Sequence, residues 1–254
     1  MTPDEGSLQP MDLAATVRLR QAVIATAQIE PLASRLREDL ALEEPFRDPG
    51  VAAFGLENVV FAIGDCFLEV VAPTAPGTAA ARQIERCGGD CGYMVLFDVR
   101  DLEGARERAA GAGVRTVWQI DLPDISGTHL HPSDMLGTIV SLDCSRPQGS
   151  WRWGGPGWTE RIGRGAPGRL TGVTVAVADP IAACGRWAGV LGLTVDPSTP
   201  ARIELQDQTI RFEARDGGPG GVVAIALQVP GSVRAGRAAL ELGALRIDLE
   251  DLPA

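Results

Sequence analysis

The feature that most constrains the fold of this chain is a strand–helix–strand order that recurs along it. The first copy has a strand, an amphipathic helix and a hairpin at residues 22–27, 30–40, 58–63 and 66–71. The second copy has a strand, a helix and two further strands at 93–99, 101–110, 114–120 and 138–142. Gln21 and Met94, at matching places in the two copies, lie 73 positions apart. That spacing is too long for a solenoid and predicts a duplicated βαβββ module.

The same order begins twice more in the second half of the chain. A third copy is predicted at 170–177, 179–190, 202–205 and 209–214, with Asp179 capping its helix. A fourth copy is predicted as a strand at 222–229, a helix at 232–242 and a strand at 245–249. Because the pattern ends there, we expect the last module to be truncated and to lack its final hairpin.

A glycine- and tryptophan-rich stretch divides the two halves. We therefore predict a leader at 1–18, a first domain at 19–145, a linker at 146–168 and a shortened second domain at 169–254. The linker contains Trp151, Trp153 and Trp158. Large aromatic side chains are rarely left in water, so these three should be pinned against a domain face or line an opening, and packing at the domain junction is the simplest interpretation.

Composition excludes several classes of protein. The net charge of −10, without a basic stripe, argues against nucleic-acid binding. The sequence has no apolar run of about 18–20 residues, so no membrane span is expected. The polar start does not resemble a secretory signal, and the five scattered cysteines indicate free thiols in a reducing cytoplasm. Cys87 and Cys91 have the wrong spacing for a zinc knuckle.

Several segments resemble the vicinal oxygen chelate superfamily, which includes glyoxalase I, methylmalonyl-CoA epimerase, extradiol dioxygenases and bleomycin-resistance proteins. The segments are the helix-entry turns 99–102 and 177–180, the strand 67–73, and the stretch His131-Pro-Ser-Asp-Met-Leu-Gly-Thr-Ile-Val-Ser-Leu142. The last is similar to the ending of the epimerases. The resemblance implies an α+β, glyoxalase-like fold, with tandem βαβββ modules forming curved mixed sheets around a cup.

In this superfamily the cup holds a divalent metal that binds vicinal oxygens of the substrate. The resemblance places the four ligand positions at Gln21, Glu69, Met94 and Ser141. A thioether is a poor ligand for Zn, Ni, Co or Mg, and a serine hydroxyl supplies no charge. We therefore expect no cofactor of the usual kind, although an atypical divalent metal stays possible. The corresponding positions of the second half fall near Gly172, Glu213 and Ala224, where no metal is expected.

Both histidines of the chain, His129 and His131, lie in a predicted loop before the last strand of the first domain. They alternate by two and so point to one side of an extended segment. They could be structural, could contact substrate or transfer a proton, or could bind a metal. Glu69, in an apolar cup, should have a raised pKa and could act as a base. The alternative for Glu69 is a pairing with an arginine across the sheet.

Two functions from different classes follow. The first is a metal-free binding protein of the bleomycin-resistance type, which holds a small, partly apolar molecule in the first cup. The second is an isomerase, epimerase or lyase acting on a small carbonyl or acyl compound, with Glu69 and His131 in acid–base roles. A scaffold for protein interactions is a third possibility, and a monomer or a homodimer is compatible with the pattern. The predicted ligand-binding residues are Gln21, Glu69, Met94, His129, His131 and Ser141.

Overall fold

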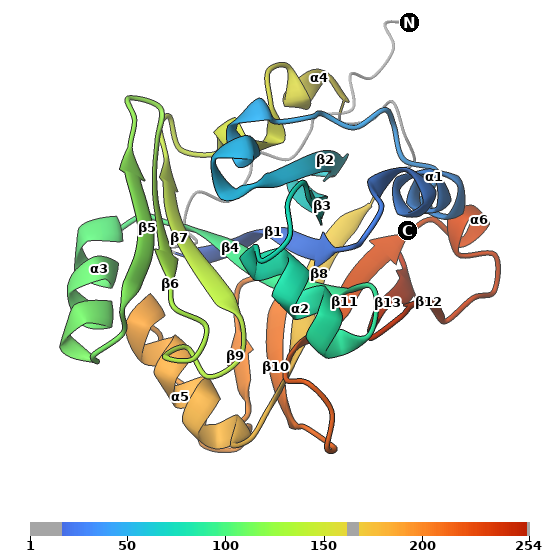
Figure 1. Cartoon of the computed structure of the whole chain (residues 1–254). Coiled ribbons are helices and arrows are strands. Elements are labelled where there is room, and N and C mark those ends of the chain that lie inside the picture. The colour runs from blue at the N-terminus through green and yellow to red at the C-terminus, as the bar shows by residue number, and fades with distance from the viewer. Residues whose placement is uncertain (1–16, 162–167, 253–254) are drawn as a thin grey trace, which may run out of the picture.

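The computed structural model of the chain describes residues 17–161 and 168–252, which form two mixed β-sheets (Figure 1). The first sheet has seven strands in the order β2-β3-β1-β4-β7-β6-β5. Its strands are β1 (Val17–Ala25), β2 (Leu56–Ile63), β3 (Cys66–Pro73), β4 (Cys91–Val99), β5 (Thr116–Asp121), β6 (Ile125–Leu130) and β7 (Ile139–Ser145). The second sheet has six strands in the order β12-β13-β11-β8-β10-β9. They are β8 (Arg169–Val177), β9 (Arg202–Glu204), β10 (Thr209–Ala214), β11 (Gly221–Val229), β12 (Ala239–Leu242) and β13 (Leu245–Asp251).

Helices connect these strands in the order that the repeat predicts. The α-helices are α1 (Ile29–Leu40), α2 (Ala79–Cys87), α3 (Leu102–Gly111), α4 (Trp158–Arg161), α5 (Pro180–Leu191) and α6 (Gly231–Arg234). Two short 3₁₀ helices, η1 (Pro49–Phe54) and η2 (Arg152–Gly154), lie in connecting segments. None of the described helices is both long and apolar enough to cross a lipid bilayer.

The two sheets repeat one pairing scheme. In the first, β1 is parallel to β3 and antiparallel to β4, and β4 is parallel to β7. In the second, β8 is parallel to β10 and antiparallel to β11, and β11 is parallel to β13. Each module therefore sends its chain from its first strand through a helix and back to a strand beside the first. The predicted α+β fold of tandem modules is confirmed.

The fourth module differs from its prediction. The helix expected at 232–242 ends at Arg234, because Ala235 and Gly236 take left-handed φ values of 49° and 77°. Residues 239–242 instead form β12, which pairs with β13 around Gly243. The module is short in its helix, but the expectation that it lacks a final hairpin was wrong.

Two further elements were not predicted. The helix α2 lies between β3 and β4, beginning after Thr78, whose hydroxyl accepts from the N–H of Ala81. The strand β6 pairs with β5 and β7 and contains His129. His129 is therefore a strand residue and not part of a loop, whereas His131 does follow the strand.

One face of the first sheet packs against the second sheet in a shared hydrophobic core. Leu19, Val95 and Phe97 of the first sheet belong to the same buried cluster as Val173 and Ile225 of the second. At Gly92 a Cβ atom would lie 2.2 Å from the carbonyl oxygen of Val222, so β4 and β11 meet at a position where only glycine fits. The opposite face of the first sheet, here called the cup face, buries a separate cluster that includes Val23, Phe67 and Trp151.

Candidate ligand-binding site

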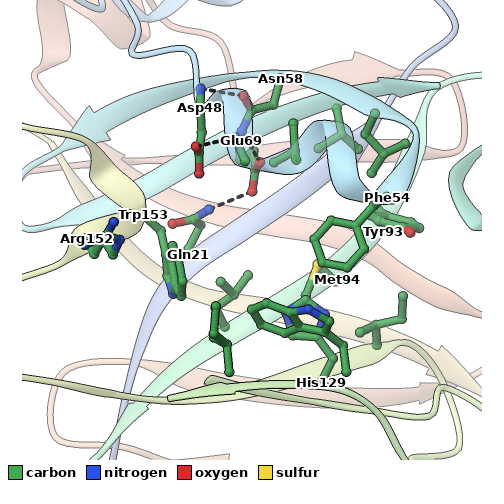
Figure 2. Close-up of a pocket in the computed structure, with 18 of the residues that line it drawn as sticks. Gln21, Asp48, Phe54, Asn58, Glu69, Tyr93, Met94, His129, Arg152 and Trp153 are labelled. Carbon is green, nitrogen blue, oxygen red and sulfur yellow. Dashed lines mark hydrogen bonds between the residues drawn. The ribbon is translucent and has the colours of Figure 1, made fainter. Parts of the chain in front are cut away.

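A cavity of about 330 Å³ lies on the cup face of the first sheet (Figure 2). Its walls come from the strands of that sheet, from η1 and from the segment that follows β7. The apolar lining residues are Val51, Phe54, Leu56, Val71, Met94, Leu96, Trp118, Ile120, Leu122, Ile139 and Trp153. The polar ones are Gln21, Asp48, Asn58, Glu69, Tyr93, His129 and Arg152. A mostly apolar hollow with a few polar groups is the usual form of a small-molecule site.

The polar groups on one side of the cavity form a continuous chain of hydrogen bonds (Figure 2). The indole Nε1–H of Trp151 donates to Oε1 of Gln21 at 2.8 Å. The amide nitrogen of Gln21 donates to Oε2 of Glu69 at 2.7 Å, and that of Asn58 donates to Oε1 at 2.6 Å. The backbone N–H of Asp48 in turn donates to Oδ1 of Asn58 at 2.9 Å. This chain fixes which amide atom each side chain turns toward the carboxylate.

Glu69 is the central group of this chain. It is 7% exposed, and burial raises its pKa, while the hydrogen bonds from Asn58 and Gln21 oppose that rise and the nearby charge of Asp48 adds to it. Both carboxylate oxygens accept from amides, and among the described residues neither accepts from an arginine. The alternative of an arginine partner across the sheet was therefore wrong.

The other side of the cavity is aromatic. The ring of His129 lies 4.4 Å from that of Trp118 and 5.9 Å from that of Phe54, measured between centroids. Figure 2 shows the Met94 sulfur beside these rings, with Tyr93 nearby. Burial lowers the pKa of His129 to about 4, so the imidazole is neutral at pH 7. In the described part of the chain its ring nitrogens have no hydrogen-bond partner, which leaves them available to a ligand.

The tryptophans of the predicted linker cover the rest of the cup face. Trp151 is 1% exposed and stacks on Phe67 at 6.4 Å, while Trp158 meets the same ring edge-on at 5.2 Å. The guanidinium of Arg20 lies 5.0 Å from the Trp151 ring centroid. Trp153, between them in sequence, lines the cavity. The prediction that these residues pack against a face or line an opening is confirmed in both its forms, and we call residues 151–158 the roof.

Trp153 also contacts a carboxylate that sequence reasoning missed. Its Nε1–H donates to Oδ1 of Asp143 at 2.8 Å. Asp143 is fully buried, and burial raises its pKa to about 7 against the effect of that hydrogen bond. It lies on β7 two residues beyond Ser141 and so on the same face of the strand. The alternation of side chains along a strand was therefore the sequence signal that pointed to Asp143.

The structure brings together four of the six predicted ligand-binding residues. Gln21, Glu69, Met94 and His129 all line the cavity. Ser141 is fully buried on β7, in register with His129, but it does not line the cavity. Phe54, Asn58, Tyr93 and Trp118 were not predicted, because η1 and the neighbouring strands bring them to the cavity only in the folded chain.

His131 is placed elsewhere. Its Nδ1 accepts from the backbone N–H of Ser133 at 3.2 Å and lies 3.2 Å from a guanidinium nitrogen of Arg115. Arg115 is itself paired with Asp134 at 2.7 Å. His131 does not line the cavity, so the fold does not direct it toward Glu69.

The residues present do not fit the divalent metal of the superfamily. The two oxygen donors, Gln21 and Glu69, are hydrogen-bonded to each other, and the Gln21 oxygen is taken by Trp151. Met94 offers a thioether and Ser141 an uncharged hydroxyl. Within residues 17–161 and 168–252, no group of three or more His, Cys, Asp or Glu side chains is arranged to hold an ion.

Comparison with known proteins agrees with this fold. No family model matches the chain. The ethylmalonyl-CoA/methylmalonyl-CoA epimerase of Cereibacter sphaeroides is 27% identical over 134 residues, which are 50% of this chain and 96% of that protein. Among solved structures, a mutant of 4-hydroxymandelate synthase from Streptomyces coelicolor has a TM-score of 0.63 and 19% identity, over 89% of this chain and 77% of that one. Methylmalonyl-CoA epimerase from Mycobacterium tuberculosis has a TM-score of 0.47 and 19% identity, over 55% and 95%.

The synthase shows that nearly the whole chain, and not only its first half, follows one known arrangement of modules. The sequence similarity to the epimerase covers half of this chain. The chain therefore has the fold of the vicinal oxygen chelate proteins.

Proposed function

We propose that the cavity of the first sheet binds a small, partly apolar organic molecule, and that it does so without the divalent metal of the superfamily. The volume of about 330 Å³ suits a molecule of one or two rings, and the apolar walls provide burial for it. The polar groups at one side are few and held in place by the hydrogen bonds between them.

The observation that supports the proposal best is that the side chains at two of the superfamily's metal-ligand positions, Gln21 and Glu69, are hydrogen-bonded to other side chains of the protein. The indole N–H of Trp151 donates a hydrogen bond to the oxygen of Gln21. The amide groups of Gln21 and Asn58 donate one hydrogen bond to each oxygen of Glu69. These side chains already satisfy one another, so an ion would have to displace hydrogen bonds that are buried and short. A ligand that makes mostly apolar contacts displaces none of them.

The test is binding of one- and two-ring aromatic probes, measured by calorimetry and by tryptophan fluorescence. The variant Leu96→Trp should fill the cavity and weaken binding at least tenfold, because Leu96 lines it and is buried. Ile181→Trp is the matched control, since Ile181 is 61% exposed and lies far along the chain on α5. No binding to the wild type, or equal binding to the Leu96 variant, would contradict the proposal.

Metal content tests the second half of the proposal. The purified chain and Glu69→Gln should both contain no stoichiometric Zn, Ni, Co or Mn. A metal that is present in the wild type and lost in Glu69→Gln would show that the cavity holds an ion in spite of its donor set.

A second candidate is an isomerase or epimerase that moves a proton beside a carbonyl group. Two observations favour it: Glu69 is a buried carboxyl group with a raised pKa inside the cavity, and the curated relative is named as an epimerase of CoA esters. A carboxylate of this kind can take a proton from a carbon next to a thioester or ketone. His131, which was predicted to share the acid–base role with Glu69, does not line the cavity, whereas His129 does.

Solvent deuterium exchange at the α-carbon of small acyl-CoA esters tests this candidate. Glu69→Gln should abolish exchange and leave binding in place. His129→Gln should slow exchange more than His131→Gln if His129 donates the proton. Unchanged exchange in Glu69→Gln would exclude the acid–base mechanism.

A further inference from the structure

The cavity has an excess of negative charge. Its lining includes two carboxylates, Glu69 and Asp48, and one cation, Arg152. The Arg152 guanidinium lies 2.7 and 2.9 Å from the two oxygens of Asp124, so its charge is already neutralised. His129 is neutral at pH 7, because burial lowers its pKa to about 4. The described lining therefore offers no cation to balance Glu69.

Within the described parts of the chain, the groups that donate to Glu69 are all neutral. Each of its oxygens accepts from an amide nitrogen, at 2.6 Å from Asn58 and 2.7 Å from Gln21. Two donors aimed at two acceptor oxygens are the arrangement that suits an ionised carboxylate. A buried charge that lacks an opposite charge is costly to keep, and the cost falls when a ligand supplies the partner.

The cavity wall opposite Glu69 also suits a positively charged ligand. Phe54 and Tyr93 lie across the cavity from Glu69 and Gln21 (Figure 2), and Trp118 also lines the cavity. Phe54 and Trp118 meet edge to face with ring centroids 5.5 Å apart, so the two rings present differently oriented surfaces to the cavity. Aromatic faces attract cations, and the attraction is stronger when the site is shielded from water. The carboxylate and the rings thus favour one kind of ligand.

We infer that the ligand is an organic cation, an amine or quaternary ammonium joined to a small apolar body. Its charged nitrogen lies toward Glu69, and its apolar part lies against Phe54 and Trp118. This inference rests on the proposed function, because it names the class of molecule that the cavity holds.

Three probes of similar size and different charge test it: phenyltrimethylammonium, its neutral isostere tert-butylbenzene, and benzenesulfonate. Calorimetry or equilibrium dialysis on the full chain should give at least tenfold tighter binding of the ammonium than of tert-butylbenzene, and the weakest binding for the sulfonate. Glu69→Gln should remove the preference for the cation over tert-butylbenzene. Glu213→Gln, which removes an exposed glutamate from β10 of the second sheet, should keep the preference.

The possible failures can be told apart. Tighter binding of tert-butylbenzene or of the sulfonate would overturn the inference and leave the proposed binding function in place. A preference for the cation that persists in Glu69→Gln would overturn the role given to Glu69. If none of the three probes binds the wild type, the proposed function fails and the inference fails with it.

Discussion

The two sheets share a module order but differ on the faces that turn away from their common core. In the first sheet, β3 is buried on both faces: Leu68 and Val70 lie in the shared core, while Phe67 and Val71 lie on the cup face. In the second sheet, β10 is buried on one face only. Ile210 and Phe212 lie in the shared core, and the alternating residues, including Arg211 and Glu213, are exposed.

The difference shows that the modules by themselves provide a sheet but not a site. The first sheet becomes a cavity because η1 and the roof cover its outer face. The outer face of the second sheet is exposed at Arg211 and Glu213 of β10 and at Arg246 of β13, and there charged side chains stand in place of apolar ones. The roof is therefore expected to stabilise the first half of the chain and also to shape the cavity that holds a ligand.

The largest expected effect comes from removing the main roof residue. Trp151→Ala should lower the free energy of unfolding by about 3–5 kcal/mol, since it deletes a buried ring stacked on Phe67 and leaves the Gln21 oxygen without its donor. Trp151→Phe keeps the stacking and loses the hydrogen bond, so it should cost about 1–3 kcal/mol. Denaturant unfolding measures both. A loss below about 1 kcal/mol for Trp151→Ala would show that the roof is a loose cover.

The second prediction uses pH to separate the buried Asp143 from the half-buried His129. The pKa of Asp143 rises from 3.8 to about 7 on folding, so its contribution to stability is present below pH 4 and is lost as the pH rises through about 7. The pKa of His129 falls from 6.5 to about 4, so its contribution is present above pH 6.5 and is lost as the pH falls through about 4. The two dependences oppose each other in the same window.

Replacing either group should therefore leave the pH dependence of stability that the other group causes. Relative to the wild type, Asp143→Asn should gain stability as the pH rises from 4 to 7, and His129→Gln should gain stability as it falls. Each change should be on the order of 2–4 kcal/mol across the window. Urea unfolding of the three proteins at pH 4.5, 5.5, 6.5 and 7.5 measures the differences. Parallel curves for all three would contradict the assigned pKa directions.

The fold could be predicted from the sequence because local patterns specify it. Three local signals predicted their elements correctly. They are the apolar–polar alternation of β10, the leucines at intervals of four residues in α1, and the Asp179-Pro180 pair at the start of α5. The fourth module was predicted wrongly for the opposite reason. Residues 239–242 have the composition of a helix, and only their pairing with β13 makes them a strand.

The site could be predicted only in part. The positions of Gln21, Glu69 and Met94 followed from the resemblance to the vicinal oxygen chelate superfamily, and all three line the cavity. The sequence predicted that the roof tryptophans pack against a face or line an opening, but it did not predict their partners, because the hydrogen bond from Trp151 to Gln21 joins residues 130 positions apart. One signal was present, however: the nearly continuous apolar run of β3 indicates a strand covered on both faces, unlike the alternating pattern of β10.

The smallest expected effect lies on the outer face of the second sheet. Arg211→Ala should change the free energy of unfolding by less than about 0.5 kcal/mol, because Arg211 is exposed and lies opposite Arg202, a like charge, across the β9–β10 pair. It should also leave binding of aromatic probes unchanged, since the cavity belongs to the first sheet. Denaturant unfolding and calorimetry measure these outcomes. A loss above about 1 kcal/mol, or weaker binding, would mean that this face is covered or coupled to the cavity, and the contrast between the two sheets would no longer hold.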